Sequence, residues 1–380
     1  MKKVLIVCLT LLVCALVLVA CGTGSDKTTA TTATTTTTAT TELIKTSGLP
    51  DSSKAPETPK APGLYDDKDE LLASWDELVN TYGLRVEEDY PFYAIEGSAC
   101  KVLSDTSVLR NGTQLVIGEV DTIGKYAFSQ CVTLKSVVIP NSVVSIGEGA
   151  FQKCENLTRV VLPEQLTKIS DYMFDLCTGL VDITLPDQLR EIGSFAFSAT
   201  SLTELTIPDS VWKIGEYAFN GARSLTSITI PSGVKRIYEN TFKDCTSLVS
   251  VTLPESLELI DSFAFYGCEK LTDITLPNGL RQIGDFVFVG CQSIKHISIP
   301  SGVEYLSEGI FGGCMALESI TIPNSVRRII KEALRNCTAL TKITFDGTKA
   351  EWIEIVKGVD WNKEVSVAEV VCSDGSVALD

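Results

Sequence analysis

One repeated unit fills most of the chain, and a representative copy reads Ile283-Gly284-Asp285-Phe286-Val287-Phe288-Val289-Gly290-Cys291-Gln292-Ser293-Ile294-Lys295-His296-Ile297-Ser298-Ile299-Pro300. Its proline and its second phenylalanine recur every 23 residues, with one step of 22 in each series, from Pro186 to Pro208 and from Phe197 to Phe219. The prolines stand at positions 140, 163, 186, 208, 231, 254, 277, 300 and 323, and the phenylalanines at 128, 151, 174, 197, 219, 242, 265, 288 and 311. A fixed period of this length predicts a solenoid, in which each turn of chain stacks on the previous one.

The end of each unit predicts a short strand. In the run from Leu271 through Ile274 to Leu276, apolar and polar positions alternate, so one face of the strand points inward. Pro277 ends the strand because it has no backbone N–H to donate.

The rest of the unit predicts the segments that connect one strand to the equivalent strand of the next coil. A second apolar pair, such as Val211 with Ile214, precedes a turn at Gly215, and residues 217–219 are expected to form about one turn of helix. We therefore expect an α/β solenoid of about ten 23-residue coils, with a parallel β-ladder and short helical or turn segments opposite it.

The repeat also has a familiar form. The pattern L-x-x-I-x-I-P, preceded by A-F-x-x-C, resembles the BspA-like leucine-rich repeats of bacterial surface proteins, over residues 114–345. The resemblance implies a right-handed leucine-rich repeat array and adhesion to host matrix proteins or to other cells. Residues 346–380, with Trp352 and Trp361, are similar to the segment that closes many such proteins.

Both ends of the array are expected to carry caps, because the terminal coils would otherwise expose their core. At the C-terminal end, residues 350–357 predict a short amphipathic helix with Trp352 and Trp361 as lid residues. At the other end, residues 64–113 form the predicted N-terminal capping region. Within it, residues 66–82 predict a helix with one apolar face, made of Leu71, Leu72, Trp75, Leu78 and Val79.

The first twenty residues predict an export signal. Two lysines precede an apolar run over residues 4–20, which ends in Leu18-Val19-Ala20-Cys21 and resembles a bacterial lipobox. We therefore expect residues 1–20 to be a lipoprotein signal peptide and Cys21 to receive the lipid that anchors the protein to the membrane. An ordinary signal peptide or a membrane anchor is the alternative.

Residues 21–63 predict an extended tether. The fourteen residues from 28 to 41 are eleven threonines and three alanines, and four prolines follow between 50 and 62. Such a segment has no apolar surface to bury and cannot offset the entropy of ordering. The expected location is the outer face of the bacterial cell membrane, with the repeats displayed at the surface.

The net charge and the histidine content argue against several classes of function. The formal net charge of −16 argues against nucleic acid as a partner, since phosphate binding needs a basic face. The chain has one histidine, His296, which removes most His-based triads and metal sites. We expect no metal, no cofactor and no enzymatic activity.

Eight cysteines fall in one register of the repeat. This spacing is not that of a metal site such as C-x-x-C, and free cysteine is often buried as a small apolar residue. We expect buried thiols, with disulfides between neighbouring coils as the alternative. The positions are 131, 154, 177, 245, 268, 291, 314 and 337.

The outward strand positions define a candidate ligand face. One column is mostly threonine, which suits strands and also occurs on ice-binding faces. The neighbouring column varies, as a binding surface would, and supplies the candidate residues Arg159, Asp182, Glu204, Asp273 and His296.

We therefore expect an adhesin-like surface protein that binds a host or cell-surface protein or glycan. Asp182 and Glu204, expected about 5 Å apart on adjacent coils, leave a glycan hydrolase of the envelope as one alternative. A purely structural envelope protein is the other.

Overall fold

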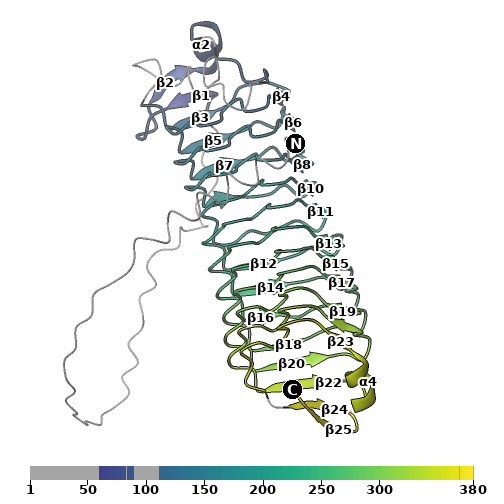
Figure 1. The fold of residues 1–380 in the computed structure, drawn as a ribbon. Helices are drawn as coiled ribbons and strands as arrows, with labels where there is room; N and C mark the ends of the chain where they lie inside the picture. Colours follow the sequence, from purple (N-terminus) through teal and green to yellow (C-terminus); the bar gives the residue numbers. More distant parts are fainter. Residues whose placement is uncertain (1–59, 83, 90–110, 368, 380) are drawn as a thin grey trace, which may run out of the picture. The chain divides into compact units, whose positions relative to one another are not determined.

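The computed structural model describes residues 60–82, 84–89, 111–367 and 369–379, and these form one stack of coils (Figure 1). The predicted signal peptide, most of the predicted tether and Cys21 lie outside the described residues. Two parallel ladders run along the stack, and the repeat is about 23 residues, as predicted. In Figure 1 the strands of the two ladders lie on opposite sides of the stack.

The first ladder contains the predicted strands. Buried and outward residues alternate in these strands, as in the pattern of one buried residue between two exposed ones in β7, β12 and β18, because side chains alternate along a strand. Its strands are β3 (Gln114–Val116), β5 (Ser136–Val138), β7 (Arg159–Val161), β9 (Asp182–Ile183), β12 (Ser227–Thr229), β14 (Ser250–Thr252), β16 (Asp273–Ile274), β18 (His296–Ser298), β20 (Ser319–Ile322), β22 (Lys342–Phe345) and β24 (Glu369–Cys372).

The second ladder comes from the second apolar pair of each unit. Each strand has two residues, and its isoleucine or leucine points inward up to β21. The strands are β4 (Thr122–Ile123), β6 (Ser145–Ile146), β8 (Lys168–Ile169), β10 (Glu191–Ile192), β11 (Lys213–Ile214), β13 (Arg236–Ile237), β15 (Leu259–Ile260), β17 (Gln282–Ile283), β19 (Tyr305–Leu306), β21 (Arg328–Ile329) and β23 (Val356–Lys357).

A third row of hydrogen bonds, here called the turn row, joins the coils at the segments for which the sequence predicts either a helical turn or a non-helical turn. Tyr217 has φ = 57°, in the left-handed region, and its N–H donates to the carbonyl of Glu239 in the next coil. Phe219 likewise donates to Thr241. Residues that alternate with them bond within the segment, as Asn220 does to the carbonyl of Tyr217 at 3.0 Å, but these bonds do not continue into an α-helix, so the segments are turns. The bonds between coils continue along the stack as far as Leu334, whose N–H donates to Trp361 of the cap.

The core consists of columns of identical residues. The phenylalanines from Phe128 to Phe311 stack with ring centroids 5.1 to 5.8 Å apart. Beside them the column cysteines are buried free thiols, which confirms the predicted burial. Most donate to a phenylalanine carbonyl of the preceding coil, as Cys268 does to Phe242 at 3.2 Å.

The N-terminal cap differs from the predicted helix over 66–82. It contains β1 (Gly63–Tyr65), β2 (Leu71–Ser74) and the short helix α2 (Trp75–Asn80). The helix cannot begin at Asp66, because this side chain accepts the backbone N–H groups of Lys68 and Glu70 and closes a turn. Strand β1 then pairs antiparallel with β2 and with β3, so it covers the edge of the first ladder.

The C-terminal cap contains the predicted helix, displaced by a residue and shorter. Helix α4 (Lys349–Glu354) begins with a capping box between Thr348 and Glu351 and is followed by β23, which extends the second ladder. Trp352 and Trp361 are both buried and pack edge to face, in the predicted lid role. Strand β25 (Gly375–Ala378) pairs antiparallel with β24 and ends the sheet.

Candidate ligand face on the first ladder

The first ladder is interrupted twice along its outward face. Backbone pairing stops at β9 and resumes with an isolated bridge between Glu204 and Ser227, and it stops again between β16 and β18. The first interruption coincides with the coil that lacks one residue, at Thr200. At the second interruption all coils have the standard length, so the sequence period alone does not account for it.

Arg159 and Asp182 are brought together by the register of β7 and β9. Their side chains form an ion pair with Nε and Oδ2 3.3 Å apart, and each is 58% exposed. An exposed pair of this kind contributes about 0 to 1 kcal/mol of stability. Its position on the open face leaves both charged groups within reach of a partner.

Asp182 and Glu204 are not joined by any β-pair among the described residues. Asp182 pairs with Arg159 of the preceding coil, whereas Glu204 pairs with Ser227 of the following coil, and the interruption lies between Asp182 and Glu204. In a retaining glycosidase two carboxyl groups face one sugar, and one of them acts as the general acid. In this structure the side chain next to Asp182 is the guanidinium of Arg159, where such a site would need a second carboxyl group.

Asp273 and His296 lie on opposite sides of the second interruption and line two adjoining depressions, which share Glu255, Thr275 and Pro277. The depression beside Asp273 has a volume of about 350 Å³ and includes Ser250 and Thr252. The depression beside His296 is larger, at about 610 Å³. His296 is exposed, and its Nδ1 lies 2.9 Å from the hydroxyl of Ser319 on β20.

The larger depression, here called the His296 depression, is lined mainly by groups of the repeat columns. The exposed hydroxyls of Thr275 and Ser298 and the partly exposed one of Thr321 stand along it, above buried prolines such as Pro300. Carboxylates of Glu255 and Asp346 complete the lining. Such a surface offers hydrogen-bond donors and acceptors over a broad, shallow area, which suits an extended polar chain better than an enclosed small molecule.

Asp273 and His296 were predicted from the sequence as ligand-face residues, but most of the lining around them was not. The threonine column was the available signal, since three of its positions, Thr275, Ser298 and Thr321, contribute to one depression. Asp346 directly follows the last residue of β22 and joins the lining from the start of the cap.

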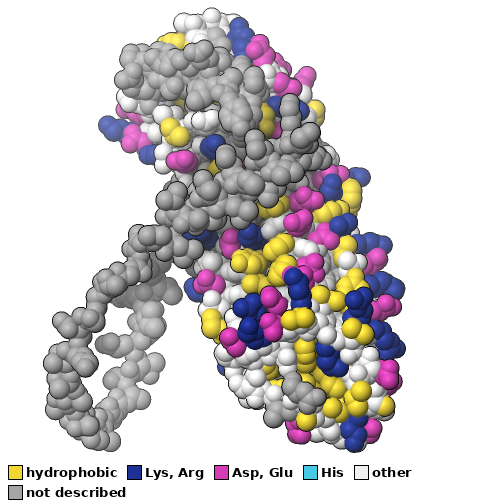
Figure 2. Space-filling model, in the orientation of Figure 1, with side chains coloured by type: hydrophobic (Ala, Val, Ile, Leu, Met, Phe, Trp, Pro, Cys, Tyr) yellow, Lys and Arg dark blue, Asp and Glu magenta, His cyan; other side chains and the backbone are white. Residues whose placement is uncertain are grey.

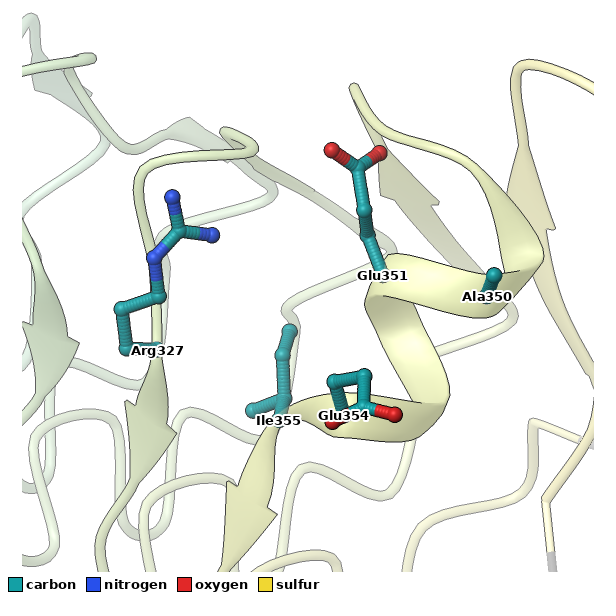
Figure 3. A pocket seen from close by; sticks show the side chains of 5 residues that line it. All are labelled: Arg327, Ala350, Glu351, Glu354 and Ile355. Carbon is teal, nitrogen blue, oxygen red and sulfur yellow. The ribbon is translucent and has the colours of Figure 1, made fainter.

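A further pocket of about 310 Å³ lies at the C-terminal cap (Figure 3). Arg327 approaches it from the last repeat coil, while Glu351 and Glu354 project from α4. Glu351 is engaged in the capping box, where hydrogen bonds from Thr348 and the charge of Arg327 lower the pKa of its carboxyl. The polar groups of this pocket therefore serve the junction between cap and repeats.

The described part of the chain contains no group of three or more His, Cys, Asp or Glu side chains arranged for a metal ion. It also contains no helix long and apolar enough to span a membrane. Burial raises the pKa of the thiols of Cys245, Cys268, Cys291, Cys314 and Cys337, to about 12 for Cys337, so these five thiols stay protonated and unreactive at neutral pH.

Similarity to known proteins agrees with this architecture. The family described as "BspA type Leucine rich repeat region" matches residues 111–223 and 212–341, in six copies. No curated protein matches the chain. A solenoid of this kind is typical of binding proteins that are not enzymes.

Three solved structures illustrate the likeness. A leucine-rich repeat protein from Bacteroides ovatus is 32% identical over 61% of this chain and 63% of its own, with a TM-score of 0.59, so this chain spans less than two thirds of that protein. A leucine-rich cell surface protein from Faecalibacterium prausnitzii is 32% identical over 64% of this chain and 82% of its own, with a TM-score of 0.42.

A leucine-rich repeat protein from Eubacterium ventriosum is 19% identical over 76% of this chain and 92% of its own, with a TM-score of 0.50, and shares the fold. The repeat pattern, the paired ladders and the matched residues together place this chain in the family of BspA-type leucine-rich repeat proteins.

Proposed function

We propose that this protein is a lipid-anchored surface binding protein that holds a protein or glycan partner on the outward face of its first ladder. The His296 depression is the observation that carries the proposal, because it concentrates hydroxyl and carboxylate groups on a face that is otherwise a regular strand surface. The Arg159–Asp182 pair supplies charged groups on the same face.

The outer face of the cell membrane is the proposed location. The apolar run over residues 4–20, followed by Cys21, supports export and lipid attachment, and the threonine-rich residues 28–41 support a spacer between the lipid and the solenoid. Cys21→Ala should remain unprocessed and unlabelled by a radioactive fatty acid. Normal acyl labelling of this variant would show that Cys21 is not the acceptor.

A binding screen tests the ligand face. Purified full-length protein in detergent is presented to immobilised matrix proteins, mucins and cell-wall glycans. Ser298→Arg fills the His296 depression with a long side chain and should abolish saturable binding. Thr229→Arg is the matched control, because Thr229 occupies the same outward column on β12 and is exposed outside the two depressions.

Loss of binding in Ser298→Arg alone supports the proposal. Equal binding by both variants, or equal loss, places the interaction elsewhere. Release of reducing sugar from any glycan in the screen would instead identify a hydrolase.

A further inference from the structure

The outward face of the second ladder carries an excess of positive charge, although the chain as a whole is acidic. Its two outward positions per coil, from residue 121 to residue 328, hold eight basic and four acidic side chains. Figure 2 shows Lys and Arg along the right-hand edge, where Figure 1 places this ladder. The basic residues are Lys168, Arg190, Lys213, Lys235, Arg236, Arg281, Arg327 and Arg328, and the acidic ones are Asp121, Glu191, Glu258 and Glu304.

Only part of this positive charge is neutralised locally. Lys168 pairs with Glu191 at 3.8 Å, Lys235 with Glu258 at 3.5 Å, and Arg236 with Asp261 at 2.6 Å. Among the residues that the structure describes, no acidic group lies within ion-pair distance of four other cations of this face: Arg190, Lys213, Arg281 and Arg328.

An exposed tryptophan lies among these cations. Trp212 is 52% exposed, and its backbone N–H donates to the carbonyl of Arg190 in the preceding coil. The next coil places Gly233 against its Cα and Cβ, so no side chain from that position covers the indole. We call Arg190, Trp212, Lys213, Lys235 and Arg236 the Trp212 patch.

We propose that the Trp212 patch binds a sulfated linear polysaccharide. Neighbouring coils are about 4.8 Å apart, so Arg190 and Lys235, which are two coils apart, are separated by about 10 Å. Arg and Lys at such regular intervals match a polymer with regularly spaced anionic groups. The indole offers a flat apolar face on which a sugar ring can pack, while its N–H remains available for a hydroxyl.

The net charge of −16 does not prevent such binding. Exposed charges farther apart than about 8 to 10 Å are largely screened at physiological ionic strength, so a bound anion responds mainly to the side chains beneath it. Within the stretch from β8 to β13, Glu191 is the single acidic side chain at an outward ladder position.

A polysaccharide fits the patch better than a nucleic acid. Single-stranded nucleic acids bind to series of aromatic side chains on which successive bases stack. The patch contains one aromatic residue, and Tyr238 beside it is engaged by the guanidinium of Arg236, 4.7 Å from the ring centroid. The patch lies on the opposite ladder from the His296 depression, so it is independent of the proposed function.

Heparin is the probe for the test, with uncharged dextran, inorganic polyphosphate and single-stranded DNA as comparison ligands. Purified full-length protein should bind heparin saturably at about 150 mM salt, which is close to physiological ionic strength. It should not bind dextran. The double variant Arg190→Ser/Lys213→Ser should bind heparin about tenfold more weakly and with a smaller dependence on salt. Lys135→Ser/Lys270→Ser is the matched control, because it removes two exposed positive charges that lie outside the second ladder and outside the two depressions, and it should bind normally.

Trp212→Ala separates sugar recognition from charge. It should weaken heparin binding about fivefold while leaving any polyphosphate binding unchanged, because polyphosphate has no ring to pack on the indole. Absence of heparin binding, an equal loss in the control, or tighter binding of DNA than of heparin would overturn the proposal. Circular dichroism of each variant establishes that it is folded before affinities are compared.

Discussion

The stacked phenylalanine column makes a quantitative prediction about Phe242→Ala. Phe242 is fully buried, and its ring stacks on those of Phe219 and Phe265, each at 5.4 Å. Truncation of a buried phenylalanine to alanine costs about 3 to 5 kcal/mol. Because two ring contacts are lost as well, we expect the upper end of this range, about 5 kcal/mol.

Phe311→Ala is the comparison that isolates the stacking contribution. Phe311 is equally buried, but its ring stacks only on Phe288, because Leu334 occupies the next position of the column. It should therefore lose about 0.5 to 1.5 kcal/mol less than Phe242→Ala. Phe288→Ala controls for distance from the cap, since Phe288 is in the adjoining coil yet stacks on two rings.

Urea titrations followed by far-UV circular dichroism give the free energy of unfolding of each variant. Phe288→Ala should match Phe242→Ala, and Phe311→Ala should be the mildest. If the three losses agree within about 0.3 kcal/mol, or if Phe288→Ala resembles Phe311→Ala, ring stacking does not contribute as argued.

Gly309→Ala should destabilise the protein by about 1 to 2 kcal/mol more than Gly313→Ala in urea titrations. Both glycines have positive φ, but a Cβ at Gly309 would lie 2.6 Å from the Phe286 ring, whereas a Cβ at Gly313 would lie 3.8 Å from its nearest atom. Equal losses in the two variants would contradict this difference in packing. The free energy of unfolding should fall as the pH rises above 9, because burial raises the pKa of the Cys337 thiol from 9.0 to about 12 and the unfolded thiol then loses its proton first. Iodoacetamide at pH 8 should modify the column thiols only after denaturant is added, and mass spectrometry that finds rapid labelling of the native protein would refute their burial. Thr348→Ala should cost about 1 kcal/mol, since it removes the side chain that caps α4; an unchanged urea midpoint would show that the capping box adds nothing.

Much of the fold follows from the repeat, because its period and its apolar alternation act together. The first-ladder strands, the phenylalanine column and the cysteine column all lie where the 23-residue register puts them. The turn at Tyr217 was harder to predict, since Tyr-Ala-Phe is compatible with one turn of helix and nothing local requires a positive φ. The preference is set by bonds to the next coil, which are long-range in sequence.

The candidate site was predictable only in part. Arg159 and Asp182 were identified as residues of the ligand face, whereas their ion pair follows from the register of β7 and β9 in the structure. The repeat pattern does not predict the interruption between β16 and β18, because the coils on both sides of it have the standard length. The basic second ladder was present in the sequence, but the overall charge of −16 concealed it.

The unbroken turn row has a mechanical consequence. Both ladders are interrupted between the same two coils, the first between β16 and β18 and the second between β17 and β19. The turn row continues past both places, for example from Phe265 to Val287 and from Phe288 to Ile310. These two coils can thus separate on the ladder sides while they stay bonded along the turn row, which then acts as a hinge. A load on the solenoid would then bend it about the turn row and alter the width of the His296 depression.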